Sequence, residues 1–301
     1  MLEIELILVC LAIGVVLRLT KRLPEIAPKV LAGWVINVAL PAAALRNVHE
    51  VSVDLDWVLA AASPWIGVLL AIAFLVPVSR SLGWSRQRLG ALVLVAGWGN
   101  TSFVGLPVIS AYAGDAWLGL GLFIDLFGSY LALSTVGIAI ATACSSGAFD
   151  WRKIVRRIAT FPPFIAIVVA LATNHLDRPV WIGGVLETLA LTLTPLALAA
   201  VGCAIRIDRF AGRIAALGIG LSFRLILAPL AFLLLYGALG QLRDPVARVA
   251  ILETAMPPML GASIIAMDHD LEPDLVALLI GIGIPLSMVT AMIWWSIIAP
   301  G

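Results

Sequence analysis

Long apolar runs separated by short polar turns are the feature that most constrains this chain. A membrane-spanning helix needs about 20 mostly apolar residues. Ten such runs can be placed along the 301 residues, and no connection between them is long enough for a separate soluble domain. The runs lie near residues 4–19, 30–45, 57–78, 90–113, 116–143, 161–174, 181–205, 214–239, 249–267 and 274–298. We therefore expect residues 1–301 to form one all-helical integral membrane domain.

The composition agrees with this class. The chain is 62% hydrophobic and only 12% charged, whereas soluble domains are about 45–50% apolar and about 25% charged. Cys10, Cys144 and Cys203 lie far apart in or beside apolar runs, so we interpret them as apolar residues and expect no disulfide framework or metal cluster. Glu3 and Glu5 precede the first run, where a cleavable signal would carry Lys or Arg. The first run is therefore expected to be a retained span.

Basic residues predict the orientation, because Lys and Arg favour cytoplasmic loops. The connections after the first, third, fifth and seventh runs are rich in them, and the intervening connections carry far fewer, such as Arg46 and Arg178. This pattern predicts that both termini are non-cytoplasmic in a multi-pass protein of the cell (inner) membrane. The basic residues of the four rich connections are Arg18, Lys21, Arg22 and Lys29; Arg80, Arg86 and Arg88; Arg152, Lys153, Arg156 and Arg157; and Arg206, Arg209 and Arg213.

Proline spacing indicates an internal repeat. Pro41 and Pro195 are 154 residues apart, and the polar centre of the fourth run has a counterpart at a similar offset in "ETAMPPMLGAS", Glu253–Ser263. This predicts two halves of five spans, about 1–145 and about 158–301. Five is odd, so the second half is expected to be inverted relative to the first. Inverted repeats with paired broken helices are typical of secondary transporters.

Two runs carry residues that break helices. Pro107 removes a backbone donor and clashes with the carbonyl four residues earlier, and Pro257 and Pro258 do so twice. Irregular backbone at membrane depth is tolerated only against protein or a water-filled cavity. We expect half-helices that end near Asn100 and Ala255, and others that begin after Pro107 and Pro258. Their positive N-terminal ends could hold a carboxylate without a fixed cation. A simple kink at each proline is the alternative.

Three motifs suggest a family. "GNTSFVGLP" (Gly99–Pro107) resembles the glycine-asparagine-x-x-phenylalanine-x-glycine-leucine-proline signature of the auxin efflux carrier family. "NVALPAAAL" (Asn37–Leu45) and "AMPPMLGASIIA" are similar to its other motifs. The resemblance implies ten spans with spans 4 and 9 crossing, a scaffold of spans 1, 2, 6 and 7, and a moving transport domain of spans 3–5 and 8–10. It also implies an organic-anion cargo such as auxin, malate or malonate.

The loop length narrows the comparison within that family. Only about 17 residues lie between spans 5 and 6, where plant auxin exporters of this family have a long cytoplasmic loop. We therefore expect a bacterial-type organic-acid carrier.

Four charged residues fall within predicted spans, where charge is costly and suggests function. Glu253, one turn before the paired prolines, is a candidate for proton coupling or a solvated vestibule residue. Asp125 is a second titrating group or a structural partner. Arg224 attracts the substrate, pairs with an acid or snorkels. Glu187 is expected to be structural. Uniport and exchange remain open beside proton coupling.

A membrane enzyme is disfavoured, because His49, His175 and His269 fall in connections or at span ends, and no metal-binding or nucleophile motif is visible. We expect no cofactor and no nucleic acid; the expected partners are the lipid bilayer and a small organic acid, with a homodimer left open. A channel-like or uniport facilitator is the alternative function. The predicted substrate-binding residues are Asn37, Asn100, Thr101, Ser102, Pro107, Pro257 and Pro258, and the predicted coupling or charge residues are Glu253, Asp125 and Arg224.

Overall fold

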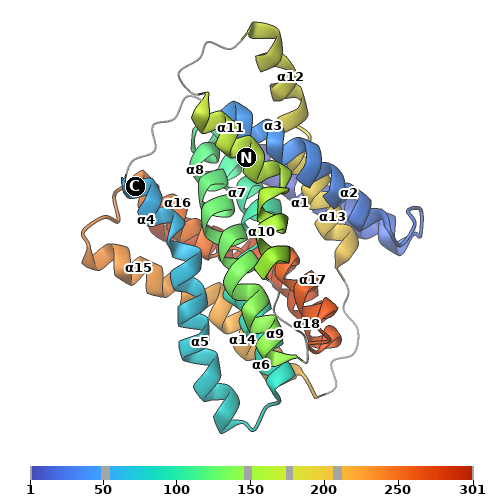
Figure 1. The fold of residues 1–301 in the computed structure, drawn as a ribbon, viewed down its shortest axis with the longest axis vertical. Helices are drawn as coiled ribbons and strands as arrows, with labels where there is room; N and C mark the ends of the chain where they lie inside the picture. Colours follow the sequence, from blue (N-terminus) through green and yellow to red (C-terminus); the bar gives the residue numbers. More distant parts are fainter. Residues whose placement is uncertain (1, 49–54, 146–150, 174–178, 206–211, 300–301) are drawn as a thin grey trace.

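The computed structural model describes residues 2–48, 55–145, 151–173, 179–205 and 212–299, and every named element in these ranges is a helix (Figure 1). Six of the described helices are long and apolar enough to cross a membrane, and two further apolar helices are shorter. This confirms an all-helical membrane protein. The count of ten spans and the inverted repeat stay predictions. The six are Ala27–Asn47, Leu55–Ser81, Asp115–Cys144, Val180–Ala204, Ile214–Ala238 and Pro273–Ile298, and the shorter two are Thr101–Tyr112 and Pro162–Ala172.

Helices of the first half follow one another with short connections. They are α1 (Leu2–Leu19), α2 (Ala27–Trp34), η1 (Val35–Ala39), α3 (Leu40–Asn47), α4 (Leu55–Ala61), α5 (Ser63–Ser81), α6 (Arg86–Gly97), η2 (Thr101–Gly105), α7 (Leu106–Tyr112), η3 (Asp115–Trp117), α8 (Leu118–Phe123), η4 (Ile124–Tyr130), η5 (Leu133–Gly137) and α9 (Ile138–Cys144). Of the η segments, η3 is a 3₁₀ turn and the others are π-helical.

The second half continues in the same way. Its helices are α10 (Trp151–Ala159), α11 (Pro162–Ala172), α12 (Val180–Ala190), α13 (Leu193–Ala204), α14 (Ile214–Ser222), the π-helical η6 (Phe223–Leu227), α15 (Ala228–Ala238), α16 (Pro245–Thr254), α17 (Leu260–Asp268) and α18 (Pro273–Ile298).

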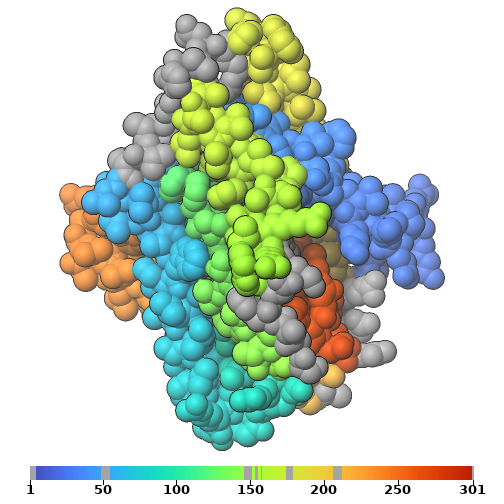
Figure 2. Space-filling view, in the orientation of Figure 1, coloured from blue at the N-terminus to red at the C-terminus, as the bar shows by residue number. Residues whose placement is uncertain are grey.

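Helix α10 was not expected, since its residues fall in a predicted connection. The segment "WRKIVRRIA" alternates basic and apolar residues with a helical period, but it has nine residues and is too short to span. Figure 2 shows α10 and α11 lying across one face of the molecule, where α10 contacts η5. The short apolar runs that define spans do not reveal such a helix.

Prolines explain three of the π-helical segments. Pro41, Pro107 and Pro229 each occupy the second residue of the α-helix that follows η1, η2 or η6. In each case the carbonyl four residues earlier lies inside the π segment, and it is the carbonyl against which a proline ring would clash. A π segment widens the turn at that carbonyl. The freed carbonyl of Leu225 then accepts a hydrogen bond of 2.8 Å from Trp294 Nε1.

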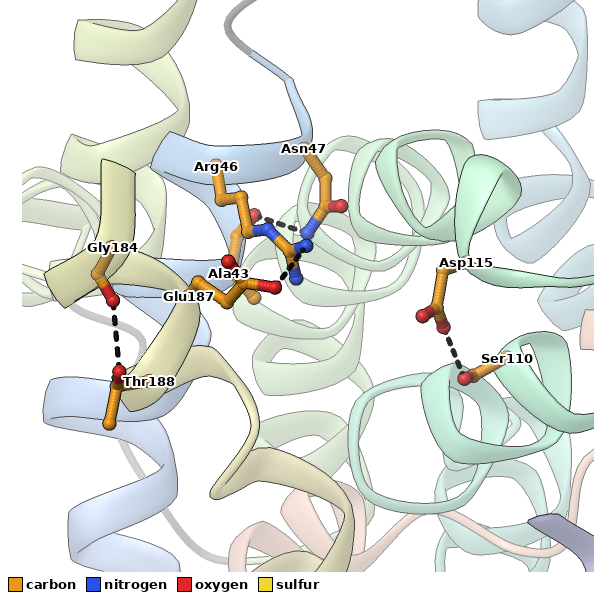
Figure 3. A network of polar contacts seen from close by, with 8 residues as sticks. All are labelled: Ala43, Arg46, Asn47, Ser110, Asp115, Gly184, Glu187 and Thr188. Atoms are coloured by element: carbon orange, nitrogen blue, oxygen red, sulfur yellow. Dashed lines mark hydrogen bonds and ion pairs between the residues drawn. The ribbon is translucent and has the colours of Figure 1, made fainter. Parts of the chain in front are cut away.

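Polar contacts between helices fall into two sets. The first set joins the helices of residues 2–47 to α12 and α13, and the second joins helices among residues 55–144 and 214–298. The first set comprises Trp34 Nε1 to Thr192 Oγ1 (3.0 Å), Arg46 to Glu187 (3.0 Å; Figure 3) and Cys203 Sγ to Gly14 O (3.2 Å). The second includes Trp65 Nε1 to Phe127 O (3.1 Å), Arg88 to Glu272 (2.8 Å) and Arg213 to Asp274 (3.0 Å).

Within the first set, α1 and α13 pack closely through glycine. A Cβ atom on Gly14 would lie 3.0 Å from Cys203 N, and one on Gly202 would lie 3.0 Å from Gly14 Cα. Small residues at such a crossing let two membrane helices approach at backbone distance. Helices α1 and α13 also contact η2 and α7 of the other set, so the two sets meet at the broken fourth span.

The membrane orientation stays a prediction. Arg178, Arg206 and Arg209, on which the charge pattern partly rests, and His49 and His175 lie outside the described residues.

Candidate functional site

The first helix break lies at residues 98–100. Helix α6 ends at Gly97, Trp98 is extended (φ −112°, ψ 139°), and Asn100 leaves helical geometry (φ −80°, ψ 70°). Asn100 then caps the next segment, because its Oδ1 accepts a hydrogen bond of 3.2 Å from Phe103 N. Its backbone carbonyl also accepts one of 2.9 Å from Gly105 N. The polar side chain, more than a proline, sets the place where the helix restarts.

Pro107 therefore has a different role from the one predicted. The half-helix begins at Thr101, six residues before Pro107, and Pro107 lies buried in the first turn of α7. The expectation that the half-helix begins after Pro107 is wrong because the π-helical η2 widens the backbone and lets the helix continue through the proline.

The second break lies at residues 255–259 and depends on proline. Helix α16 ends at Thr254 with Ala255 as its C-cap, and α17 begins at Leu260 after an extended Met259 (φ −78°, ψ 125°). Pro257 and Pro258 both fall inside this break. Each removes a helix donor and disfavours helical geometry in the residue before it. The predicted end near Ala255 and the predicted restart after Pro258 are confirmed.

The two breaks lie against each other. Asn100 N donates a hydrogen bond of 2.7 Å to Pro257 O, and Gly99 pairs with Pro258 in an antiparallel β-bridge. A Cβ atom on Gly99 would lie 3.0 Å from Glu253 O, so the close approach requires glycine. These contacts join segments more than 150 residues apart in the sequence. Ligand binding at the junction stays a prediction.

Unused hydrogen-bond donors gather at the junction. Asn100 Nδ2 and Trp98 Nε1 are buried, and neither has a hydrogen-bond partner among the described residues. The first N–H groups of η2 and α17 add to them, because the first turn of a helix lacks intrahelical acceptors. A group of unpaired donors at helix N-termini suits an anionic oxygen.

Thr101 and Ser102 have partners inside the protein. Both hydroxyls donate to Asp125 Oδ1 on η4, with a distance of 2.6 Å from Ser102 Oγ. Ser129 Oγ lies 3.1 Å from Thr101 Oγ1. Of the two roles considered for Asp125, these contacts support the structural one, since Asp125 ties η4 to the start of the half-helix.

Glu253 is buried near the end of α16. Its relative exposure is 2%, and neither carboxyl oxygen has a hydrogen-bond partner among the described residues. Gly105 packs on this carboxyl group, because a Cβ atom there would lie 2.7 Å from Oε1. The solvated-vestibule alternative does not fit such burial. A buried carboxyl group without partners is costly and calls for a functional explanation.

Arg224 contacts the C-terminal ends of both interrupted helices. From η6 its Nη1 donates to Gly97 O, the last residue of α6, at 3.3 Å, and its Nη2 donates to Thr254 O, the last residue of α16. Arg224 is buried, so it does not snorkel. Sequence reasoning identified the residue and missed its partners. No local signal could have supplied them, because Gly97 lies 127 residues away.

A narrow cavity connects these groups. It has an empty volume of about 270 Å³ and is lined on its polar side by Thr101, Ser129, Arg224, Glu253 and Thr254. The cavity therefore reaches the charged side chains and the ends of both broken helices. Among the described residues, no group of three or more His, Cys, Asp or Glu side chains could hold a metal ion.

The remaining predicted residues lie apart from this cluster. Asn37 is exposed on η1, and its Nδ2 donates a hydrogen bond of 2.7 Å to Gly33 O in its own helix. Glu187 pairs with Arg46 across α12 and α3 (Figure 3). The ion pair agrees with the structural role expected for Glu187.

Comparison with known proteins identifies the family. A family model described as membrane transport protein matches residues 3–149 and 146–295. A protein of Methanothermobacter thermautotrophicus, described as an uncharacterized transporter, is 26% identical over 96% of this chain and 95% of its own length. Another of that description from Methanocaldococcus jannaschii is 24% identical over 96% of each chain. With its two broken helices and its matched motifs, this chain therefore belongs to the membrane transport protein family, which is the auxin efflux carrier family.

Proposed function

We propose that this protein is a secondary transporter that moves a small organic anion, such as a mono- or dicarboxylate, across the membrane by alternating access. The substrate binds where the breaks at residues 98–100 and 255–259 meet. The single observation that carries the proposal is the buried Asn100 Nδ2, which has no hydrogen-bond partner among the described residues. It lies beside two half-helix N-termini, where a carboxylate would complete the unpaired donors.

The division of polar contacts supports the transport mechanism. The inter-helix hydrogen bonds and ion pairs described above join helices within one set, and contacts between the sets include the packing of α1 and α13 on η2 and α7. Ring stacking of Tyr130 on Phe161, with centroids 3.8 Å apart, lies at another such contact. An interface of this kind suits a rigid-body displacement of one set against the other.

The charges suggest how a proton could be coupled to the substrate. Arg224 supplies one positive charge near the two carboxyl groups of Glu253 and Asp125. One bound proton would therefore make the formal charge of the three groups zero. Asp125 already accepts two hydrogen bonds, whereas Glu253 accepts none from the described residues. Glu253 is therefore the group proposed to take up and release the proton.

A ligand screen followed by uptake tests this proposal. The purified protein is heated with a panel of small mono- and dicarboxylates, and those that raise the melting temperature are tested for uptake into proteoliposomes. Asn100→Ala is expected to reduce uptake at least about tenfold, since an unpaired polar contact in a buried site is worth about 1–3 kcal/mol. Asn47→Ala is the matched control, because Asn47 Nδ2 bonds only Ala43 O in its own helix, at 2.9 Å.

Unchanged uptake in Asn100→Ala would contradict the assignment of the site. Saturable counterflow supports a carrier. Sustained currents that exceed carrier turnover would instead show the channel-like alternative.

A further inference from the structure

We propose that the Arg224 guanidinium is a resident counter-cation for the C-terminal ends of both interrupted helices, so that this protein needs no sodium ion at this site. The cation belongs to the chain itself and occupies the position that a small ion would otherwise fill. The inference concerns the structure of the site, and only its uptake experiment rests on the proposed function.

The surroundings of the guanidinium are those of a cation site. Oxygen atoms converge there from the last carbonyls of α6 and α16, Gly97 O and Thr254 O, and both accept hydrogen bonds from Arg224. The same cavity is lined by the Glu253 carboxyl group and the hydroxyls of Thr101 and Ser129. Carbonyls at the ends of broken helices, together with hydroxyls and a carboxylate, are ligands suited to Na⁺ in transporters.

The charges also match. A helix C-terminus carries about half a negative charge, so two such ends together carry about one. The single positive charge of Arg224 balances them. Arginine suits this task better than lysine, because its planar fork can donate to two carbonyls at once.

Packing on both sides of Arg224 fixes its place. The preceding Phe223 stacks on Phe74 of α5, with ring centroids 5.6 Å apart and an interplanar angle of 18°. The following Leu225 accepts the hydrogen bond from Trp294 of α18. Because its neighbours are anchored to two other helices, Arg224 is held at the junction and is not free to accompany a substrate.

Thermal unfolding in different salts tests the inference without any substrate. The wild type, Arg224→Ala and the exposed control Arg243→Ala are melted at constant ionic strength in choline chloride, with Na⁺ or up to about 20 mM guanidinium added. Arg224→Ala is expected to melt roughly 5–10 °C below wild type, since removing one partner of a buried charged contact is strongly destabilising. Guanidinium should restore much of this loss in a saturable manner. The wild type and Arg243→Ala should respond to neither cation.

Two results would overturn the inference. One is saturable stabilisation of the wild type by Na⁺. The other is an Arg224→Ala protein that folds and responds to guanidinium no more than the wild type does. If Arg224→Ala cannot be recovered in choline chloride, it is purified in guanidinium; recovery there alone supports the inference, and failure in both leaves the wild-type Na⁺ titration to decide.

The uptake experiment adds a functional readout. Initial uptake of a carboxylate identified by the screen should agree within about twofold in sodium, potassium and choline media, whereas loss of uptake without sodium would overturn the inference. If no carboxylate is transported at all, the proposed function fails while the melting experiment still decides the role of Arg224.

Discussion

The two helix breaks reach a similar geometry by different chemistry. At residues 98–100, a single asparagine restarts the helix by capping it, and the prolyl residue of the motif lies further along. At residues 255–259, two prolines interrupt the helix, and no side chain caps α17. A break can therefore come from a side chain that satisfies the backbone or from residues that cannot continue it. Only the first kind also leaves a spare side-chain donor, Asn100 Nδ2, among the described residues.

The largest effect is expected from keeping the two breaks apart. Gly99→Val would place a branched side chain 3.0 Å from Glu253 O and 3.3 Å from Met256 Cβ. Forced overpacking costs about 1–3 kcal/mol, and here it also opposes the Asn100 N to Pro257 O hydrogen bond. We expect a lower melting temperature and lost uptake. Gly261→Ala is the control, because its nearest neighbour would be 3.5 Å away; equal melting temperatures of the two variants would contradict the close approach.

A second experiment separates the two tasks of Asn100. Serine can cap a helix as asparagine does, whereas alanine costs about 1 kcal/mol at such a position. Asn100→Ser should therefore melt near the wild type, and Asn100→Ala below it. Both lack the amide donor, so both should lose at least about tenfold in uptake. Restored uptake in Asn100→Ser would show that capping alone matters.

The two buried carboxyl groups should respond differently to neutral replacement. Asp125→Asn removes the acceptor of Thr101 and Ser102, so we expect a loss of about 1–3 kcal/mol in the free energy of unfolding. Glu253→Gln breaks no described hydrogen bond and should melt close to the wild type. In proteoliposomes, Glu253→Gln should abolish the substrate-driven pH change. A pH change of wild-type size in that variant, or none in the wild type, would refute proton coupling through Glu253.

The smallest effect is expected for Asn37→Ala. Asn37 is exposed and bonds only Gly33 O among the described residues, so the melting temperature should stay within about 2 °C of wild type, as for most surface substitutions. Its motif predicts a contribution to substrate binding from the scaffold side. Uptake measures that contribution: a loss as large as that of Asn100→Ala would show that Asn37 reaches the substrate in another conformation.

Much of the fold could be read from local patterns. Apolar runs predicted where helices lie, since lipid leaves the helix as the structure in which each segment satisfies its own backbone. The second break was placed within a residue at each end, because the effect of Pro257 and Pro258 on the backbone is local. Pro107 misled the prediction for the first break, since a π-helical segment absorbed the proline and Asn100 decided the boundary.

Roles within the charged cluster were beyond local patterns. Asp125, Arg224 and Glu253 could be singled out because charge is rare at membrane depth. Their partners depend on contacts between residues far apart in the chain: Arg224 bonds the ends of two helices that lie 127 and 30 residues away. Thr101 and Ser102, predicted as ligands, turn to Asp125 on another helix.

The sequence by itself determined that this chain is a helical membrane protein with two interrupted helices, because hydrophobicity and backbone chemistry act residue by residue. Only the tertiary structure decided that the interruptions touch, that Asp125 holds the start of one half-helix and that Arg224 caps the ends of two others. Helix ends carry unpaired groups whichever partners they meet. Which side chain meets them depends on packing across the whole molecule.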